Sequence, residues 1–515
     1  MRILWIDDEI DLLRPFIYAL RDKGYEVETA TNGLDGLELA QQREFDLVLL
    51  DQIMAGMQGL EVLRRLKQTD PNLLVTMVTK SDDEAVVNEA YGDMVDDFLI
   101  KPFTPAQLLA VLKRLLDKRR LVAERMGQQF MAAMNQSRDL STWPAWVEYC
   151  RSLFYWQNVL GRYGDAALNE IQEDRWQRAN EEFTRFVLAE YKRWLTAKSQ
   201  VTSRGLPVSD NTPVLSHRFI EEFVRPHWED RPTYLLVFDS MRLDQWEAIT
   251  PLLRDYFEVE TRYYCALLPS ATPYARNAIF SGLLPLDILR QYPQYWVFDE
   301  SGQNRFEKEL LTEYLRRLRF TGRFTFVKAP SSDDLQRERG ALLDSGVRFT
   351  VLVFNFLDQL IHSVKTTQVL DEIIPNDQAL VAMTRVWFSS SAVFTLLKSL
   401  ARLDCRVVIT SDHGFIRVKR PTVIHGGREI SPNLRYKFGG ALRVDERTAL
   451  LLREPAVFAL PAEHTSSNIA IAFSDYYFIY PTKLKQYEKT YKMSYQHGGI
   501  SLGEMVVPVA TLRPR

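Results

Sequence analysis

The chain has 515 residues, and its 64 lysine and arginine residues nearly balance 67 aspartate and glutamate residues, giving a formal net charge of −3. This balance argues against a protein that coats nucleic acid or an anionic membrane, and the 46% hydrophobic content excludes a disordered chain. Three widely spaced cysteines exclude a disulfide framework and fit a reducing compartment, and no apolar run approaches the roughly 18 residues that cross a bilayer. We therefore expect a cytoplasmic protein of about three domains with no membrane segment.

Strands and helices alternate over residues 1–118. Apolar runs predict strands at Arg2–Ile6, Tyr25–Thr29, Phe45–Leu50, Leu73–Val78 and Asp97–Ile100, and helical spacing predicts helices at Ile10–Leu20, Gly33–Ala40, Leu60–Leu66 and Glu84–Tyr91. Thr104 followed by Pro105 predicts the start of a last helix. Five β-α units of this length predict a doubly wound parallel sheet, which binds ligands at the carboxyl ends of its strands.

Residues 119–205 contain no convincing strand and hold five of the ten tryptophans. This pattern predicts a central α-helical bundle with an aromatic core, which connects two α/β domains. The segment Ser203–Leu215 is rich in turn-forming residues and reads as a linker.

Longer α/β alternation follows in residues 206–515. Apolar runs predict strands at Thr233–Phe238, Phe349–Phe354 and Arg406–Ile409, with helical stretches between them. The sequence therefore predicts three parts with boundaries at 1–118, 119–205 and 206–515, of which the first and last are α/β domains.

Acidic residues follow two strands of the first domain. Asp7 and Asp8 follow the first strand and Asp51 follows the third, so the topology brings the three carboxylates into one crevice. Clustered carboxylates repel one another and favour a hard cation such as Mg²⁺. Thr79 and Lys101 follow the fourth and fifth strands, which adds a hydroxyl and an ammonium group suited to a transferred phosphoryl group.

This pattern resembles the receiver domain of two-component response regulators. The resemblance implies that Asp51 accepts a phosphoryl group from a sensor histidine kinase. It implies that Asp8, Asp51 and the carbonyl oxygen of Ile53 hold Mg²⁺, with Asp7 helping through water.

The same resemblance assigns the other receiver positions. Thr79 and Lys101 would bind the phosphoryl oxygens, and Phe98 stands where the family has its switch aromatic. Two residues depart from the family pattern: Ala55 replaces a proline, and Lys80 stands where a small residue is common. Neither departure removes a catalytic group, but Lys80 lies where it would alter access to Asp51.

Six aspartates and histidines lie just after strands or in loops of the last domain. They are Asp239, Asp358, His362, Asp412, His413 and His497. Three aspartates and three histidines suffice for two cations with three protein ligands each and an open position, which is the catalytic arrangement for zinc. The histidine content favours zinc over manganese.

Thr272 is a candidate nucleophile. It precedes a proline suited to the first turn of a helix, where the helix dipole and free N–H groups favour an alkoxide and a phosphate. Arg276 lies one turn further on and would reach phosphoryl oxygens. His425, in a second His-Gly-Gly, is at most a substrate-pocket residue, and a loop histidine is the simpler interpretation.

Residues 215–515 resemble the alkaline phosphatase superfamily, and within it the PglZ domains. The resemblance is carried by Pro269-x-x-Thr272, Ser281-Gly282, His497-Gly498-Gly499 and Glu504-Met505-Val506-Val507-Pro508. It implies one zinc on Asp358, His362 and His497 and a second on Asp239, Asp412 and His413, with Thr272 between them. It also implies in-line attack by Thr272, a phosphothreonine intermediate, and hydrolysis of that intermediate by water.

The order of the three parts resembles PorX-type response regulators of type IX secretion in Bacteroidetes. The resemblance implies a sensor kinase and an extracytoplasmic-function sigma factor as partners, and nucleotide phosphodiesters, including cyclic oligonucleotides, as substrates. It also implies a homodimer on phosphorylation, through a receiver face at about residues 82–117. Two functions stay open: a phosphorylation-controlled metallophosphodiesterase, and an adaptor for the sigma factor in which the PglZ domain is a scaffold.

Overall fold

The computed structural model describes residues 1–43, 45–69, 73–80, 95–136, 138–163, 166–197, 212–228, 231–298, 302–328, 332–343, 346–426, 433–464, 466–481 and 484–515. The chain divides into two compact units, one of Met1–Gln136 with Val159–Leu168 and one of Ser137–Asn158 with Asn169–Arg515. The predicted helix Glu84–Tyr91, part of the predicted receiver face at 82–117 and most of the linker Ser203–Leu215 lie outside the described residues.

The first unit holds a five-stranded parallel sheet in the order β2-β1-β3-β4-β5. Its strands are β1 (Arg2–Ile6), β2 (Glu26–Ala30), β3 (Leu47–Asp51), β4 (Leu74–Thr79) and β5 (Asp97–Ile100), and its helices are α1 (Arg14–Asp22), α2 (Gly33–Gln42), α3 (Gly59–Thr69) and α5 (Pro105–Met134). A short 3₁₀ turn at Ile10–Leu13 precedes α1. The doubly wound prediction is confirmed.

Two apolar cores lie on opposite faces of this sheet. Successive residues of β1 and β3 belong alternately to one core and the other, as the two-residue period of a strand requires. Helices α1 and α5 cover one face and α3 covers the other. β3 is buried along its whole length and β1 from Ile3 onward, which explains the continuous apolar sequence of these stretches.

Helix α5 begins as predicted at Thr104 and Pro105. The Thr104 side chain accepts a hydrogen bond from the backbone N–H of Gln107, whose side chain returns the bond in a capping box. The helix then runs for 30 residues, past residue 118, because no proline interrupts it before Met134.

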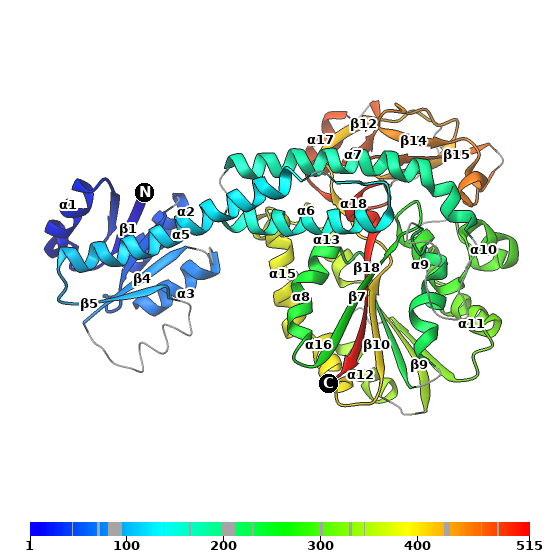
Figure 1. The fold of residues 1–515 in the computed structure, drawn as a ribbon, viewed down its shortest axis with the longest axis horizontal. Coiled ribbons are helices and arrows are strands. Elements are labelled where there is room, and N and C mark those ends of the chain that lie inside the picture. The colour runs from blue at the N-terminus through cyan, green and yellow to red at the C-terminus, as the bar shows by residue number, and fades with distance from the viewer. Residues whose placement is uncertain are drawn as a thin grey trace. The chain divides into compact units, whose positions relative to one another are not determined.

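The middle of the chain is helical, as predicted. It contains α6 (Trp143–Tyr163) and α7 (Ala166–Thr196), labelled in Figure 1. Trp143, Trp146 and Trp194 are buried in the largest apolar core of the second unit, and the rings of Trp143 and Trp194 meet edge to face with centroids 6.1 Å apart. Trp176 is partly buried against the same core.

The second unit is built on a mixed six-stranded sheet in the order β7-β18-β10-β6-β9-β8. Its strands are β6 (Thr233–Phe238), β7 (Phe257–Cys265), β8 (Arg323–Lys328), β9 (Val347–Phe354), β10 (Arg406–Ser411) and β18 (Val506–Pro514). Strands β8, β9, β6 and β10 are parallel, and β18 runs antiparallel to β10 and β7. The three predicted strands are therefore neighbours at the centre of the sheet.

Helices cover both faces of this sheet. The described α-helices of this unit that follow α7 are α8 (Leu243–Leu253), α9 (Thr272–Ser281), α10 (Pro285–Gln291), α11 (Glu307–Arg317), α12 (Ser332–Leu342), α13 (Phe356–Ser363), α14 (Gln368–Ile373), α15 (Asp377–Ser390), α16 (Ala392–Leu400), α17 (Leu484–Tyr491) and α18 (Leu502–Met505). Residues of α8, α12 and α16 share one core with the sheet, and residues of α9 and α11 share the other with α6 and α7.

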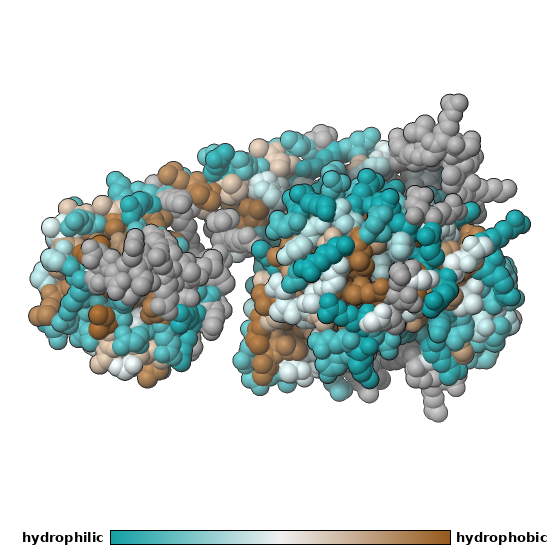
Figure 2. All heavy atoms as spheres, turned by 90° about the horizontal axis from the view of Figure 1, so that it is seen from below, coloured by the Kyte–Doolittle hydropathy of each residue, from teal (hydrophilic) through white to brown (hydrophobic). Residues whose placement is uncertain are grey.

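Short strands beside the large sheet form three smaller sheets. They are β11 (Ile416–Arg417), β12 (Arg420–Val423), β13 (Tyr436–Gly440), β14 (Ala449–Leu452), β15 (Ser467–Ala472), β16 (Tyr476–Ile479) and β17 (Tyr495–Gln496), which pair as β11-β17, β12-β16 and β13-β15-β14. In the described chain no single helix is long and apolar enough to cross a membrane, and α15 and α16 pass on length and composition only as a pair bent by 57°. Hydrophilic side chains cover much of the face in Figure 2.

Candidate phosphoacceptor and metal sites

The first site lies at the carboxyl ends of the receiver strands. Asp7 follows β1 and Asp51 ends β3, and a ligand atom from each of Asp7, Asp8 and Asp51 lies within 4.8 Å of the others. Lys101, just after β5, places its Nζ 2.7 Å from Asp7 Oδ2 and 2.8 Å from Asp51 Oδ1. The structure therefore brings together the predicted carboxylates and the predicted ammonium group.

Burial and charge act against each other at this site. Burial raises the pKa of Asp51, as does the charge of Asp7, while the hydrogen bond from Lys101 lowers it. Burial alone would lower the pKa of Lys101, but its bonds to Asp51 and Asp7 outweigh this and raise it. Lys101 is thus held as a cation beside Asp51.

The other predicted receiver residues lie around this centre. Thr79 ends β4, and its hydroxyl donates to Gln52 Oε1 at 2.5 Å. Phe98 lies on β5, partly buried against the core between the sheet and α3, and Ile53 is 60% exposed. Lys80 points to Glu9, with its Nζ 2.9 Å from Glu9 Oε2, so this departure from the family pattern forms an exposed ion pair.

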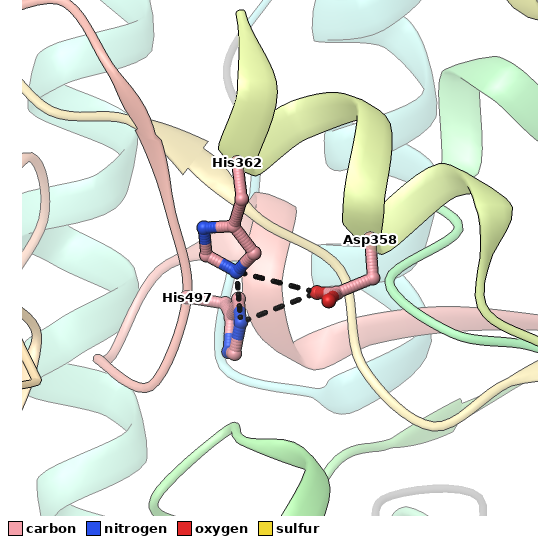
Figure 3. Close-up of side chains that lie close together, drawn as sticks. All are labelled: Asp358, His362 and His497. Carbon is pink, nitrogen blue, oxygen red and sulfur yellow. Dashed lines mark hydrogen bonds and ion pairs between the residues drawn. The ribbon is translucent and has the colours of Figure 1, made fainter. Parts of the chain in front are cut away.

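The second site combines α13 with a distant loop. Asp358 and His362 lie four residues apart on α13, so they project from one face of the helix, and His497 follows β17. The Nε2 atoms of His362 and His497 lie 3.3 and 3.5 Å from Asp358 Oδ1 and 3.1 Å from each other. Figure 3 shows these three polar groups pointing toward one another.

The three side chains of this trio shift one another's pKa values. Burial raises the pKa of Asp358, but hydrogen bonds from His362 and His497 outweigh it and hold that pKa far below its usual range. Burial and the neighbouring His413 and His362 lower the pKa of His497, whereas the hydrogen bond to Asp358 outweighs burial and raises the pKa of His362. Asp358 and His497 are thus in the ionised and neutral forms that bind a metal, and His362 would give up its proton when a metal binds.

The third site lies where two adjacent strands, β6 and β10, end at the same register position. Ser411, at the end of β10, is in register with Phe238 at the end of β6, so Asp239 and the Asp412–His413 pair emerge side by side. The hydroxyl oxygen of Thr272 lies 3.0 Å from His413 Nε2 and 3.3 Å from Asp239 Oδ1. Asp239, Asp412 and His413 form a buried group with ligand atoms within 4.8 Å of one another.

One buried atom tests whether these residues fit a metal. Oδ2 of Asp412 is buried and makes no hydrogen bond, with Nη1 of Arg276 3.6 Å away. Burial and the charge of Asp239 raise the pKa of Asp412 to about 8 despite Arg276, so a bound cation would displace a proton from this carboxyl near neutral pH. Burial lowers the pKa of His413, so its imidazole is neutral. The donor sets of both clusters, two histidines with one carboxylate and one histidine with two, fit zinc.

Thr272 is the first residue of α9, and Pro273 is the second. Ala271, not Thr272, occupies the cap position and makes no side-chain cap bond. Pro273 therefore lies in the first turn of the helix, as the sequence predicts. Thr272 sits at the helix N-terminus, and its hydroxyl oxygen lies 3.0 Å from His413 Nε2.

Arg276 is buried among carboxylates. Its Nη1 lies 2.6 Å from Asp239 Oδ2 and 3.6 Å from Asp412 Oδ2, and its Nε lies 2.6 Å from Glu307 Oε1. Arg276 is therefore a counter-ion to the carboxyl groups of the Asp239 cluster. The exposed His425 pairs through its backbone with Arg443 and is absent from the metal-ligating groups of the described residues.

Ser240 is a site residue that the sequence analysis missed. Its hydroxyl donates to Asp358 Oδ1 at 2.9 Å and its backbone N–H donates to Asp412 Oδ1 at 3.2 Å, so it bridges the two clusters. Its φ of 61° is in the left-handed region, which is strained for a serine. Its position directly after Asp239 is the sequence feature that could have identified it as a site residue.

Comparison with family models decides the identity of the second unit. A model described as the BREX system PglZ alkaline phosphatase-like domain matches residues 219–512, more than half of the chain. The chain belongs to the PglZ family. A response regulator receiver domain model matches residues 3–113 upstream of the PglZ domain, and a PorX response regulator linker domain model matches residues 119–195. In this order the three matches identify a PorX-type response regulator with a receiver and a PglZ domain.

Individual relatives match the receiver part of this PglZ protein. Response regulator ArlR of Staphylococcus aureus (strain COL) is 34% identical over 116 residues, which are 22% of this chain and 52% of that protein. The chain thus spans about half the length of the curated relatives it matches. Chemotaxis protein CheY4 of Vibrio cholerae is 32% identical over 22% of this chain and 98% of its own, with a TM-score of 0.22. Response regulator TrrA of Thermotoga maritima, in complex with Mg²⁺-BeF, is 30% identical over 22% of this chain and 98% of its own, with a TM-score of 0.21.

Proposed function

We propose that this chain is a response regulator in which phosphorylation of Asp51 controls a two-zinc phosphodiesterase with Thr272 as its nucleophile. The observation that carries the proposal is the position of the Thr272 hydroxyl within 3.3 Å of ligands from the Asp239, Asp412 and His413 cluster. A hydroxyl placed among neutral imidazole and carboxylate ligands has the setting of an activated nucleophile.

The residues of the chain divide the work. Asp358, His362 and His497 would hold one zinc, and Asp239, Asp412 and His413 the other. When bound, the two cations would neutralise phosphoryl oxygens and lower the pKa of the Thr272 hydroxyl. Arg276 holds the Asp239 carboxylate in place and is itself held by its bond to buried Glu307.

The reaction follows from Thr272 as attacking group. A bond forms between Thr272 Oγ1 and phosphorus while the bond from phosphorus to one ester oxygen breaks, and the departing alkoxide takes a proton. Water then attacks the same phosphorus, releases the phosphate monoester and restores the threonine hydroxyl. Asp239 Oδ1, 3.3 Å from the Thr272 hydroxyl oxygen, orients the hydroxyl proton that Thr272 loses as its bond to phosphorus forms, which balances the proton that the alkoxide takes.

Charge supports a metal-dependent reaction on a phosphodiester. The clusters set three carboxyl groups against one buried guanidinium, which gives an anionic diester little electrostatic attraction. Two divalent cations would make the site positive. We infer a nucleotide phosphodiester substrate, including cyclic oligonucleotides, from the PorX-type resemblance.

Control would begin at the receiver. Asp8, Asp51 and the Ile53 carbonyl would bind Mg²⁺ with Asp7 assisting through water, and Thr79 and Lys101 would bind the phosphoryl oxygens delivered by a sensor histidine kinase. Phosphorylation would convert monomers to homodimers in the cytoplasm. Sedimentation with and without a phosphoryl donor tests this step, and an unchanged mass with Asp51 phosphorylated contradicts it.

The alternative is an adaptor for an extracytoplasmic-function sigma factor, with the PglZ domain as a scaffold. Burying Asp412 Oδ2 without a hydrogen bond costs about 1–3 kcal/mol, which a scaffold has no reason to retain. This observation favours the enzyme. Regulation of type IX secretion and sigma-factor binding are compatible with either function.

Turnover separates the two candidates. Wild-type protein and Thr272→Val are compared on bis-(p-nitrophenyl) phosphate, with metal content measured on the same samples. We expect metal-dependent turnover in the wild type and a loss of at least about 100-fold in the variant. Metal-free protein, or equal turnover in the variant, contradicts the proposal.

A further inference from the structure

Three buried polar side chains lie along one face of α7. Asn180, Thr184 and Tyr191 are 1%, 4% and 0% exposed. Their spacing of four and seven residues keeps them on one side of the helix. Because buried polar groups need partners, the atoms that they bond show what this face of α7 holds.

Tyr191 bonds the segment that carries the nucleophile. Its hydroxyl oxygen accepts a hydrogen bond of 2.7 Å from the backbone N–H of Leu268. Leu268 begins the short stretch that leads through Pro269 and Ser270 to Thr272. Tyr191 therefore fixes the backbone four residues before the attacking hydroxyl.

Asn180 bonds the segment that carries His497. Its Oδ1 accepts a hydrogen bond of 2.8 Å from the backbone N–H of Leu502, and its Nδ2 donates to the carbonyl oxygen of Trp176 one turn earlier on α7. Thr184 adds a longer contact, with its hydroxyl 3.4 Å from the carbonyl oxygen of Ile500. The loop from His497 to Leu502 is therefore tied to the same helix face.

The two tied segments also contact each other. The hydroxyl of Ser270 donates to the carbonyl oxygen of Gly499 at 2.7 Å. Asn180 and Tyr191 are eleven residues apart, or about 16 Å along the helix axis. One rigid helix thus sets the spacing of two segments that supply Thr272 and His497 to the clusters.

We propose that α7 is a positioning element of the metal site, in which Tyr191 and Asn180 set the placement of Thr272 and His497 and pass the state of the receiver to them. This inference rests on the proposed function and names how that site is regulated. The boundary between the two compact units falls within this helix, since Ala166–Leu168 belong to the first unit and Asn169 onward to the second. Displacement or rotation of α7 would alter both segments together.

Two substitutions remove the contacts with little change in volume. Tyr191→Phe deletes one oxygen atom, and Asn180→Leu replaces an amide by an isosteric apolar group. Two matched controls remove buried bonds of the helical middle that reach neither segment. Tyr149→Phe loses the bond from Arg175, and Gln172→Leu loses the bond to the carbonyl oxygen of Leu153.

The test measures amide hydrogen exchange at Leu268 and Leu502, zinc dissociation by chelator competition, and kcat and KM on the diester. For each variant we expect faster exchange at its own partner amide, weaker zinc retention, and a fall in kcat on the order of ten-fold with little change in KM. The two controls should match the wild type. In the wild type, beryllofluoride on the receiver should change exchange at both amides.

Two results overturn the inference: variants that behave as their controls do, or exchange at both amides that beryllofluoride leaves unchanged. Tyr191→Phe keeps the test informative if Asn180→Leu does not fold. Hydrogen exchange and zinc retention can be measured whether or not the protein hydrolyses the diester. A wild type that hydrolyses no diester would therefore sink the proposed function while these measurements still judge the role of α7.

Discussion

The hydroxyl oxygen of Thr272 lies 3.0 Å from Nε2 of His413, a residue 141 positions further along the chain. Parallel register explains the meeting, since β10 ends level with β6 and delivers His413 beside Asp239 at one edge of the sheet. The start of α9 delivers the hydroxyl to the same point. The proposed nucleophile and the proposed metal ligands are thus placed by separate elements of one scaffold.

Asp358→Asn should remove one zinc ion from each chain and leave the other. The substitution replaces the carboxylate that the imidazoles of His362 and His497 both face, so this site loses its only anionic ligand. The ligand atoms of Asp239, Asp412 and His413 are unchanged. Elemental analysis after dialysis measures the change from about two zinc ions to one. Asp371→Asn, on a carboxylate paired with Lys365, is the control and should keep both. Full zinc content in Asp358→Asn contradicts the ligand assignment.

Metal uptake at the Asp412 cluster should depend on pH. Because the pKa of Asp412 is raised to about 8, a cation must displace a proton from it below that pH. Apparent affinity should therefore fall as pH drops below about 8, by up to about ten-fold per unit. Chelator competition between pH 6 and pH 8 measures this fall, and constant affinity over the range contradicts it.

The same shift predicts the stability of the metal-free protein. A carboxyl whose pKa is higher folded than unfolded binds its proton more tightly in the folded state. The free energy of unfolding should therefore decrease as pH rises from 3.8, the ordinary pKa of an aspartate, toward about 8. Urea unfolding of chelator-treated protein, compared with Asp412→Asn, measures this slope. An equal slope in the variant would show that another group is responsible.

Gly414→Ala should destabilise the protein by about 1–3 kcal/mol or more. A Cβ at this position would lie 2.0 Å from the backbone carbonyl oxygen of Gly503, which has no side chain to swing away. Gly340→Ala is the matched control, because it lies in α12 with nothing within 4 Å, and it should stabilise by up to about 1 kcal/mol. Thermal unfolding compares the two. Equal shifts in Tm would contradict the close approach at Gly414.

Asp51→Asn should abolish phosphoryl transfer to the receiver, while Asp11→Asn should leave it intact. Asp51 lies beside the Lys101 ammonium group at the carboxyl end of the sheet, whereas Asp11 forms an exposed pair with Arg14. Lys101→Met should weaken the response, because it leaves two buried carboxylates without their cation. Incubation with a small phosphoryl donor followed by intact-protein mass spectrometry reports each case. Phosphorylation of the Asp51→Asn variant would show that another residue is the acceptor.

The clusters at strand ends were predictable from the sequence, because the carboxyl ends of parallel strands lie together at one edge of a sheet. Recognising two buried strands was enough to predict that Asp7 and Asp51 lie close together. Recognising two more was enough for Asp239 and Asp412. The length of α5 was harder to predict, since no stop signal lies near the predicted boundary at residue 118 and the helix runs on to Met134.

Contacts between distant side chains were beyond sequence reasoning. The bond between Asn180 and Leu502 joins positions 322 residues apart, and nothing in either residue type announces it. Arg276 shows the same limit, because spacing placed it near Thr272 but its direction depends on Glu307, a buried carboxylate on another helix. Ser240 bridges two clusters only because the backbone turns sharply after β6.

The central claim is that Thr272 forms a covalent bond to phosphorus. Acid quenching of zinc-loaded protein during turnover of bis-(p-nitrophenyl) phosphate, followed by peptide mass spectrometry, tests it directly. The account predicts a p-nitrophenyl phosphate adduct on Thr272 in the wild type and none in Thr272→Val. Turnover with no adduct on Thr272 under conditions that trap acid-stable phosphoesters, or an adduct on another residue, would contradict it.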